Sequence, residues 1–215
     1  MSLTLAVIFA GLIGTTAQQT PPIFNPGAPG APSRVISPAE AVELSRTGFV
    51  EADVRFMQHM IVHHAQAVEM VALMETRAAS PTVRRLGERI ARSQEAEMAL
   101  MREWLGERGQ PVAPADLHAG HQGHMDGAMT ADTPLMPGML SPARMATLAA
   151  ASGPAFDRLF LEGMIQHHQG ALNMVEALLD DPEAAEDPTL SDFTNSVTAD
   201  QSAEILRMQS ILSEL

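Results

Sequence analysis

The chain has 215 residues, of which 46% are hydrophobic, 26 are acidic, 13 are basic and none is cysteine. A chain of this length can bury a sizeable core without covalent cross-links, and the lack of thiols excludes disulfides, thiolate-bound zinc and iron–sulfur clusters. Because the formal net charge is -13 and every basic residue is arginine, no lysine- and arginine-rich stripe is available for phosphates, and we expect no nucleic-acid partner.

The first residues, 1–17, predict an export signal peptide. An uninterrupted apolar run extends from Leu3 to Gly14, and the small residues at 15–17 resemble a cleavage site. The run is shorter than the ~20 residues that span a bilayer. We therefore expect a periplasmic or secreted protein with no membrane contact after cleavage. Residues 18–36 contain five prolines, which predicts an extended tether.

An internal repeat organises residues 37–215. A constant shift of the sequence pairs Ser37-Pro38 with Ser141-Pro142 and His63-His64 with His167-His168. Such self-similarity indicates duplication of one helical hairpin. We predict repeat one at 37–109, a His- and Met-rich connection at 110–140, and repeat two at 141–215.

Helix boundaries follow from capping residues and glycines. Ser or Asp precedes Pro at four predicted helix starts, Pro38, Pro81, Pro142 and Pro188. Glycines that can end a helix in the left-handed conformation follow at Gly48, Gly109 and Gly153. The pattern predicts short lead-in helices at 38–47 and 142–151, and long helices at 50–78, 81–108, 155–180 and 188–213. No stretch alternates long enough for a sheet, so we predict an all-α antiparallel four-helix bundle.

Histidine and methionine lie on the apolar faces of the long helices. Each repeat places Met three residues before the His-His pair and seven residues after its first His, whereas Gln66 falls on the polar face. Gln and Glu of the partner helices point inward as well. Buried imidazoles and carboxylates need partners. They could form a structural polar layer, or they could support a metal site as a second shell, comprising Asp53, Gln94, Glu97, Asp157, Gln201 and Glu204.

The connection adds a second set of soft ligands. It contains His118, His121, His124, Met125 and Met129, followed by Met136 and Met139. A loop has no core to account for its methionines. Thioethers suit Cu(I), and imidazole suits copper in either oxidation state, so copper is favoured, with Cu(I) ahead of Cu(II) and zinc less favoured. The alternative is a solvated low-complexity linker. Because imidazole must be neutral to coordinate, we expect metal binding to weaken below pH ~6.5.

Two segments resemble a known family. They are FMQHMIVHH at 56–64 and FLEGMIQHH at 160–168, each followed by a Gln-x-x-Glu helix. They are similar to the domain-of-unknown-function 305 family, whose fold resembles ferritin and which includes a periplasmic copper-binding member. The resemblance implies a ferritin-like bundle and copper ligands at Met60, His63, His64, Met70, Met164, His167, His168 and Met174.

Three functions fit the sequence. The first is a non-catalytic, exported copper-binding protein that sequesters the ion or delivers it to a copper transporter or cuproprotein. The second is a ferritin-like metal-dependent oxidoreductase, although the Glu-x-x-His pattern of di-iron bundles and other catalytic signatures are missing. The third is a structural or interaction bundle with a polar His/Glu layer. The sequence does not decide the oligomeric state.

Overall fold

The structure, a computed structural model, describes residues 21–26, 32–45, 48–114 and 132–215. The chain divides into two compact units, Met1–Arg46 and Thr47–Leu215. The predicted signal peptide lies outside the described residues, as do five predicted loop ligands, His118, His121, His124, Met125 and Met129.

The first unit pairs two short strands ahead of a helix. Strands β1 (Ile23–Asn25) and β2 (Arg34–Ile36) are antiparallel, with Phe24 opposite Val35. Helix α1 (Pro38–Ser45) follows, and Ser37 Oγ accepts a hydrogen bond from the Glu40 N–H at 3.1 Å. The segment predicted to be a simple extended tether therefore contains a small hairpin. Its β-branched and aromatic residues favour strands, and the prolines lie outside them.

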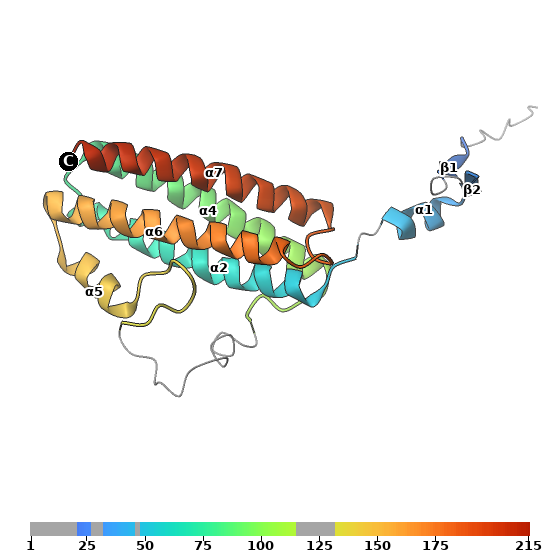
Figure 1. Ribbon diagram of the computed structural model, residues 1–215, viewed down its shortest axis with the longest axis horizontal. Coiled ribbons are helices and arrows are strands. Elements are labelled where there is room, and N and C mark those ends of the chain that lie inside the picture. Colours follow the sequence, from blue (N-terminus) through green and yellow to red (C-terminus); the bar gives the residue numbers. More distant parts are fainter. Residues whose placement is uncertain (1–20, 27–31, 46–47, 115–131) are drawn as a thin grey trace, which may run out of the picture. The chain divides into compact units, whose positions relative to one another are not determined.

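The second unit is the four-helix bundle. It contains the helices α2 (Glu51–Ala72), α3 (Met74–Arg77), α4 (Pro81–Glu107), α5 (Pro142–Ala150), α6 (Gly153–Leu179) and α7 (Pro188–Ser213). Helices α2 and α4 form one hairpin, α6 and α7 form the other, and α2 packs against α6 (Figure 1). The all-α prediction is confirmed. Among the described residues, no helix has the length and apolar character needed to span a membrane.

The predicted helix starts agree with the structure. Ser80, Ser141 and Asp187 each accept a hydrogen bond from the backbone N–H three residues later, at 3.4, 3.3 and 3.0 Å. Gly109 adopts the positive φ expected at a helix end, 64°. Gly153 also has a φ of 64°, but it is the first residue of α6 and does not end α5. The helix predicted over 50–78 is instead divided at Leu73 into α2 and α3.

Two buried aspartates tie the repeats together. Asp53 accepts from the Ala185 N–H at 2.8 Å, in the turn between α6 and α7. Asp157 accepts from the Ser80 N–H at 2.7 Å, in the turn between α3 and α4. The start of each repeat's first long helix thus lies at the turn of the other repeat, so α2 and α6 run antiparallel about an approximate two-fold axis.

These contacts correct the role predicted for Asp53 and Asp157. Each lies ten residues before the first histidine of its repeat, which is about 15 Å along an α-helix. Their carboxylates bind backbone N–H groups at helix ends and do not support the histidines.

A polar layer separates two apolar clusters in the core. One cluster contains the first half of α2 and the second half of α6, including Met60 and Val175. The other contains the second half of α2 and the first half of α6, including Met70 and Met164. The His-His pairs fall between the two clusters on both helices, which places four imidazoles at mid-height of the bundle.

Candidate metal centre

The polar layer consists of buried side chains from all four long helices. The histidines His63, His64, His167 and His168 are fully buried, at 0% exposure. Gln94 on α4 and Gln201 on α7 are 2% exposed. The inward orientation predicted for these groups is confirmed.

The second histidine of each pair binds a carboxylate. His64 Nε2 lies 2.5 Å from Glu97 Oε2, and His168 Nε2 lies 2.7 Å from Glu204 Oε2. Both glutamates are partly buried, with side chains 16% and 17% exposed. The two contacts are related by the internal repeat, and they provide the partners that the sequence predicted these buried groups to need.

The first histidine of each pair binds a backbone carbonyl instead. His63 Nε2 lies 3.0 Å from the carbonyl oxygen of Pro137, in the connection between the repeats. His167 Nε2 lies 2.9 Å from the carbonyl oxygen of His63 itself. The repeat symmetry is therefore broken here, because Pro137 replaces the helix carbonyl that symmetry would provide.

These four partners fix which ring nitrogen carries the proton. A carbonyl oxygen or an ionised carboxylate can only accept a hydrogen bond, so each neutral imidazole carries its proton on Nε2. The lone pair then lies on Nδ1. All four Nδ1 atoms are buried, and none has a hydrogen-bond partner among the described residues. The same holds for the amide groups of Gln94 and Gln201.

The two histidine pairs meet at the centre of the bundle. The ring centroids of His63 and His167 are 3.9 Å apart with an interplanar angle of 41°. Within each pair the centroids are 6.3 and 6.4 Å apart. Two imidazoles at the shorter distance repel one another if both are protonated, so the arrangement disfavours a positive charge on both rings.

Burial keeps the central rings neutral. Desolvation lowers the pKa of His63 to about 3, assisted by the nearby His64, while the hydrogen bond to Pro137 opposes the shift. Desolvation, with His63 next in importance, also holds the pKa of His167 well below its ordinary value. The sequence-based expectation of protonation near pH ~6.5 is therefore wrong for these two residues.

Of the predicted sulfur ligands, two lie next to the layer. Met60 and Met164 are fully buried and precede His63 and His167 by three residues, about 4.5 Å along the helix. Within the described ranges, no three His, Asp or Glu side chains are arranged to chelate one ion. Imidazole and thioether groups are among the donors that the layer provides.

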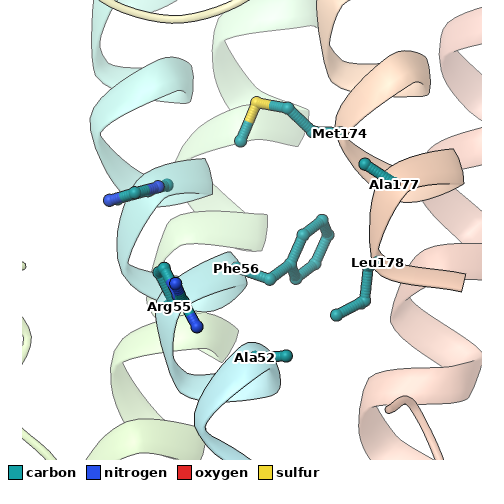
Figure 2. Close-up of a pocket in the computed structure, with 7 residues that line it drawn as sticks. Ala52, Arg55, Phe56, Met174, Ala177 and Leu178 are labelled. Atoms are coloured by element: carbon teal, nitrogen blue, oxygen red, sulfur yellow. The ribbon is translucent and has the colours of Figure 1, made fainter. Parts of the chain in front are cut away.

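The other two predicted sulfur ligands lie away from the imidazoles. Met70 and Met174 follow His63 and His167 by seven residues, about 10 Å along the helix. Figure 2 shows Met174 and Phe56 in a separate open pocket between α2 and α6. His59 lines the same pocket. The Met70 methyl group packs 3.2 Å from the position that a Cβ on Gly163 would take. The structure therefore does not bring Met70 and Met174 to the layer.

The end of the connection packs against the bundle. Met136 and Met139 are 8% and 6% exposed, so the expectation that the connection has no core for its methionines is wrong for these two. Gln66, predicted to be solvated, bonds the backbone of Leu140. Sequence reasoning missed Pro137 because a backbone carbonyl leaves no residue-type signal.

The sequence matches one family over most of its length. Residues 53–212 match the profile of DUF305, a domain of unknown function. The chain belongs to the DUF305 family. No curated protein matches it.

Three solved relatives share the fold. A DUF305 fragment from Deinococcus radiodurans is 33% identical, covers 78% of this chain and 99% of its own, and superposes with a TM-score of 0.64. A DUF305 protein from Streptomyces coelicolor, provisionally named as secreted, is 29% identical with coverages of 76% and 93% and a TM-score of 0.64. CopM in its Cu(II)-bound form is 31% identical with coverages of 75% and 96% and a TM-score of 0.57. CopM is also solved in Cu(I)-bound and Ag-bound forms.

Proposed function

We propose that this DUF305 protein is an exported metal-binding protein that holds monovalent copper at the buried histidine layer and sequesters or delivers it without catalysis. The observation that carries the proposal is the set of four buried Nδ1 atoms with no hydrogen-bond partner among the described residues. Buried polar atoms are nearly always satisfied, and exceptions call for an explanation such as an ion. Unprotonated imidazole nitrogens are metal ligands.

The partners of the opposite ring nitrogens support the same conclusion. Metal-binding histidines almost always donate their other N–H to a carboxylate or a backbone carbonyl, which fixes the tautomer and orients the ring. His64 and His168 use carboxylates, and His63 and His167 use carbonyls. A purely structural polar layer would be expected to pair the Nδ1 atoms as well, so the unpaired atoms favour the metal hypothesis over the structural one.

The donor set favours copper over zinc. Structural zinc sites need four ligands in a tetrahedron, whereas monovalent copper accepts fewer ligands and binds thioethers as well as imidazoles. The layer is flanked by the buried thioethers of Met60 and Met164. The relative CopM binds copper and silver, and silver is a common probe for monovalent copper. Cu(II) at other positions is compatible with this proposal.

The remaining parts of the proposal rest mainly on the sequence. The apolar run at 3–14 supports export, as does the provisionally secreted relative. The absence of Glu-x-x-His in this sequence favours binding over di-iron catalysis. The loop ligands at 118–129 lie outside the described residues and stay a prediction, with capture of the ion as their proposed role. A copper transporter or cuproprotein is the proposed recipient.

An anaerobic competition titration tests the proposal. The mature chain, residues 18–215, is titrated with Cu(I) against a chromogenic chelator, with Zn(II) in parallel. We expect tight Cu(I) uptake that is lost when His63, His64, His167 and His168 are replaced together by Gln, while the helical circular dichroism is retained. A variant with the loop residues His118, His121 and His124 changed to Gln is the matched control. Uptake that survives the layer variant and disappears in the loop variant would contradict the assignment of the layer.

A further inference from the structure

A short segment of the connection is fastened across α2 and α6 beside the histidine layer. We name residues 136–140, which immediately precede Ser141 and α5, the strap. The Gln66 side chain on α2 bonds both backbone groups of Leu140, accepting from its N–H at 2.7 Å and donating to its carbonyl at 2.9 Å. Gln166 on α6 donates to the carbonyls of Gly138 and Met139 at 3.2 and 3.3 Å. Two glutamines from opposite repeats thus hold the strap.

The backbone of the strap packs directly against the backbone of α6. Gly138 has φ of 76°, a conformation that favours glycine. A Cβ on Gly170 would collide with the Pro137 carbonyl oxygen and with the Cα of Gly138. Gly170 on α6 is the repeat equivalent of Gln66 on α2. The strap packs against the glycine on α6 and is hydrogen-bonded by the glutamine on α2. The two helices therefore contribute different groups to one contact.

The carbonyl that this packing fixes is the one bound by His63. Pro137 lies between the buried Met136 and the clamped Gly138, and its oxygen accepts the His63 Nε2–H at 3.0 Å. His167 has no such dependence, because its acceptor is the carbonyl of His63 on α2. Only one of the two equivalent histidines therefore takes its orientation from outside the four long helices.

We infer that the strap is a positioning element that locks His63 in the tautomer with a free Nδ1 lone pair, so that it controls one of the two histidine pairs and leaves the other to the helices. The inference rests on the proposed function for its metal consequence. It implies that the two pairs bind the ion unequally, although their sequences are repeated. Displacing the strap removes the acceptor of His63 Nε2 and opens that ring to the opposite tautomer, which turns a ligand nitrogen into a donor.

The substitution Gly170→Ala tests the inference with little risk to the fold. Alanine is a better helix former than glycine, so α6 should be retained while the added methyl pushes the strap away. Gly106→Ala is the matched control, because a Cβ at Gly106 in α4 meets nothing within 4 Å. The double variant Gln66→Ala with Gln166→Ala removes the strap contacts independently.

Three measurements are made on each variant. Long-range ¹H–¹⁵N NMR of the metal-free protein reports the tautomer of each histidine, hydrogen exchange reports the Leu140 amide, and Cu(I) competition reports affinity. In Gly170→Ala we expect faster Leu140 exchange, a mixture of tautomers at His63, and a single Nε2–H tautomer at His167. One Cu(I) affinity should fall by roughly ten- to a hundredfold, the usual effect of losing a partner that orients a metal ligand. Gly106→Ala should resemble the parent in all three.

Two results would overturn the inference. Faster Leu140 exchange with His63 still locked would mean that the strap does not position the ring. Unchanged Leu140 exchange in Gly170→Ala would mean that the strap is not seated on Gly170. If the parent binds no Cu(I), the proposed function fails, whereas the tautomer measurement on the metal-free protein still decides whether the strap positions His63.

Discussion

Mild acid should destabilise the metal-free protein, because the fold requires neutral rings at His63 and His167. The pKa of His63 is lowered to about 3, and the pKa of His167 is lowered as well, whereas an unfolded chain protonates histidine near pH ~6.5. Between these values the unfolded state binds more protons than the folded state. Stability is therefore complete above pH ~6.5 and is lost as the pH falls toward 3.

The size of the effect follows from the difference between the two pKa values. Each pH unit inside this window changes the free energy of unfolding by about 1.4 kcal/mol per histidine. Going from about pH 7.5 to about pH 5 should therefore cost about 2 kcal/mol from His63 alone. His167 shifts in the same direction and adds to this loss.

The titration of Asp187 does not contribute to this pH dependence. Burial raises its pKa, but hydrogen bonds from Trp104, the Leu190 N–H and Arg108 outweigh that effect, and the net pKa is lowered from 3.8. Stability from a carboxylate of this kind is lost only as the pH falls below its ordinary pKa. A comparison that stops at about pH 5 therefore measures histidines and not this aspartate.

Urea unfolding in the presence of a metal chelator, at the two pH values, measures the loss. The substitution His63→Gln keeps a side-chain N–H for the Pro137 carbonyl and removes the titrating ring. The variant should lose about 2 kcal/mol less than the parent between the two pH values, whatever its absolute stability. Equal losses in parent and variant would refute the claim that burial keeps His63 neutral.

Three further predictions concern the ties between helices and the bound ion. Asp53→Asn and Asp157→Asn should each lower the free energy of unfolding by about 1–3 kcal/mol, because each carboxylate accepts from backbone N–H groups in the turn of the other repeat. Urea unfolding measures this, and an effect at only one site would contradict the two-fold arrangement. Asp187→Ala removes the cap of α7 and the acceptor of Trp104 Nε1–H at 3.0 Å, so it should cost about 2–4 kcal/mol, with Asp187→Asn recovering part of the loss. Silver at a hundred times its Kd should stabilise the parent by about 2.7 kcal/mol in thermal unfolding, whereas the fourfold His-to-Gln layer variant should show no stabilisation.

Helix boundaries could be predicted from the sequence because they depend on local chemistry. A serine or aspartate followed by proline marks the start of a helix, because its side chain can accept a hydrogen bond from the backbone N–H three residues later. Ser80, Ser141 and Asp187 all accept this hydrogen bond. The inward placement of the histidines was also predictable, since periodicity alone assigns a face. The break at Leu73 was not predictable, because the apolar pattern continues through it.

Long-range contacts account for the predictions that were wrong. Inward-facing aspartates near a helix start look the same in sequence whether they serve a metal site or a distant turn, and only the folded chain shows Asp53 bonded to Ala185. Met70 and Met174 lie on the same helix face as the histidines, but a helix face extends along the whole helix and does not by itself bring two residues together. The antiparallel crossing places Met174 beside Phe56 and His59 in a separate pocket (Figure 2), away from the four buried histidines of the layer.

The duplicated sequence predicts two similar sites that differ where His59 of repeat one is replaced by Gly163 of repeat two. The structure shows which contacts of the histidine pairs are equivalent and which are not. His64 and His168 have equivalent carboxylates because Glu97 and Glu204 are themselves repeated. His63 and His167 lie together near the approximate two-fold axis. The backbone carbonyl of His63 accepts the hydrogen bond of His167, but the backbone carbonyl of His167 does not accept one from His63. A single-copy segment must then supply the missing acceptor, and Pro137 does so. The connection between the repeats has no duplicate in the sequence, so it can give two otherwise similar histidine pairs different affinities.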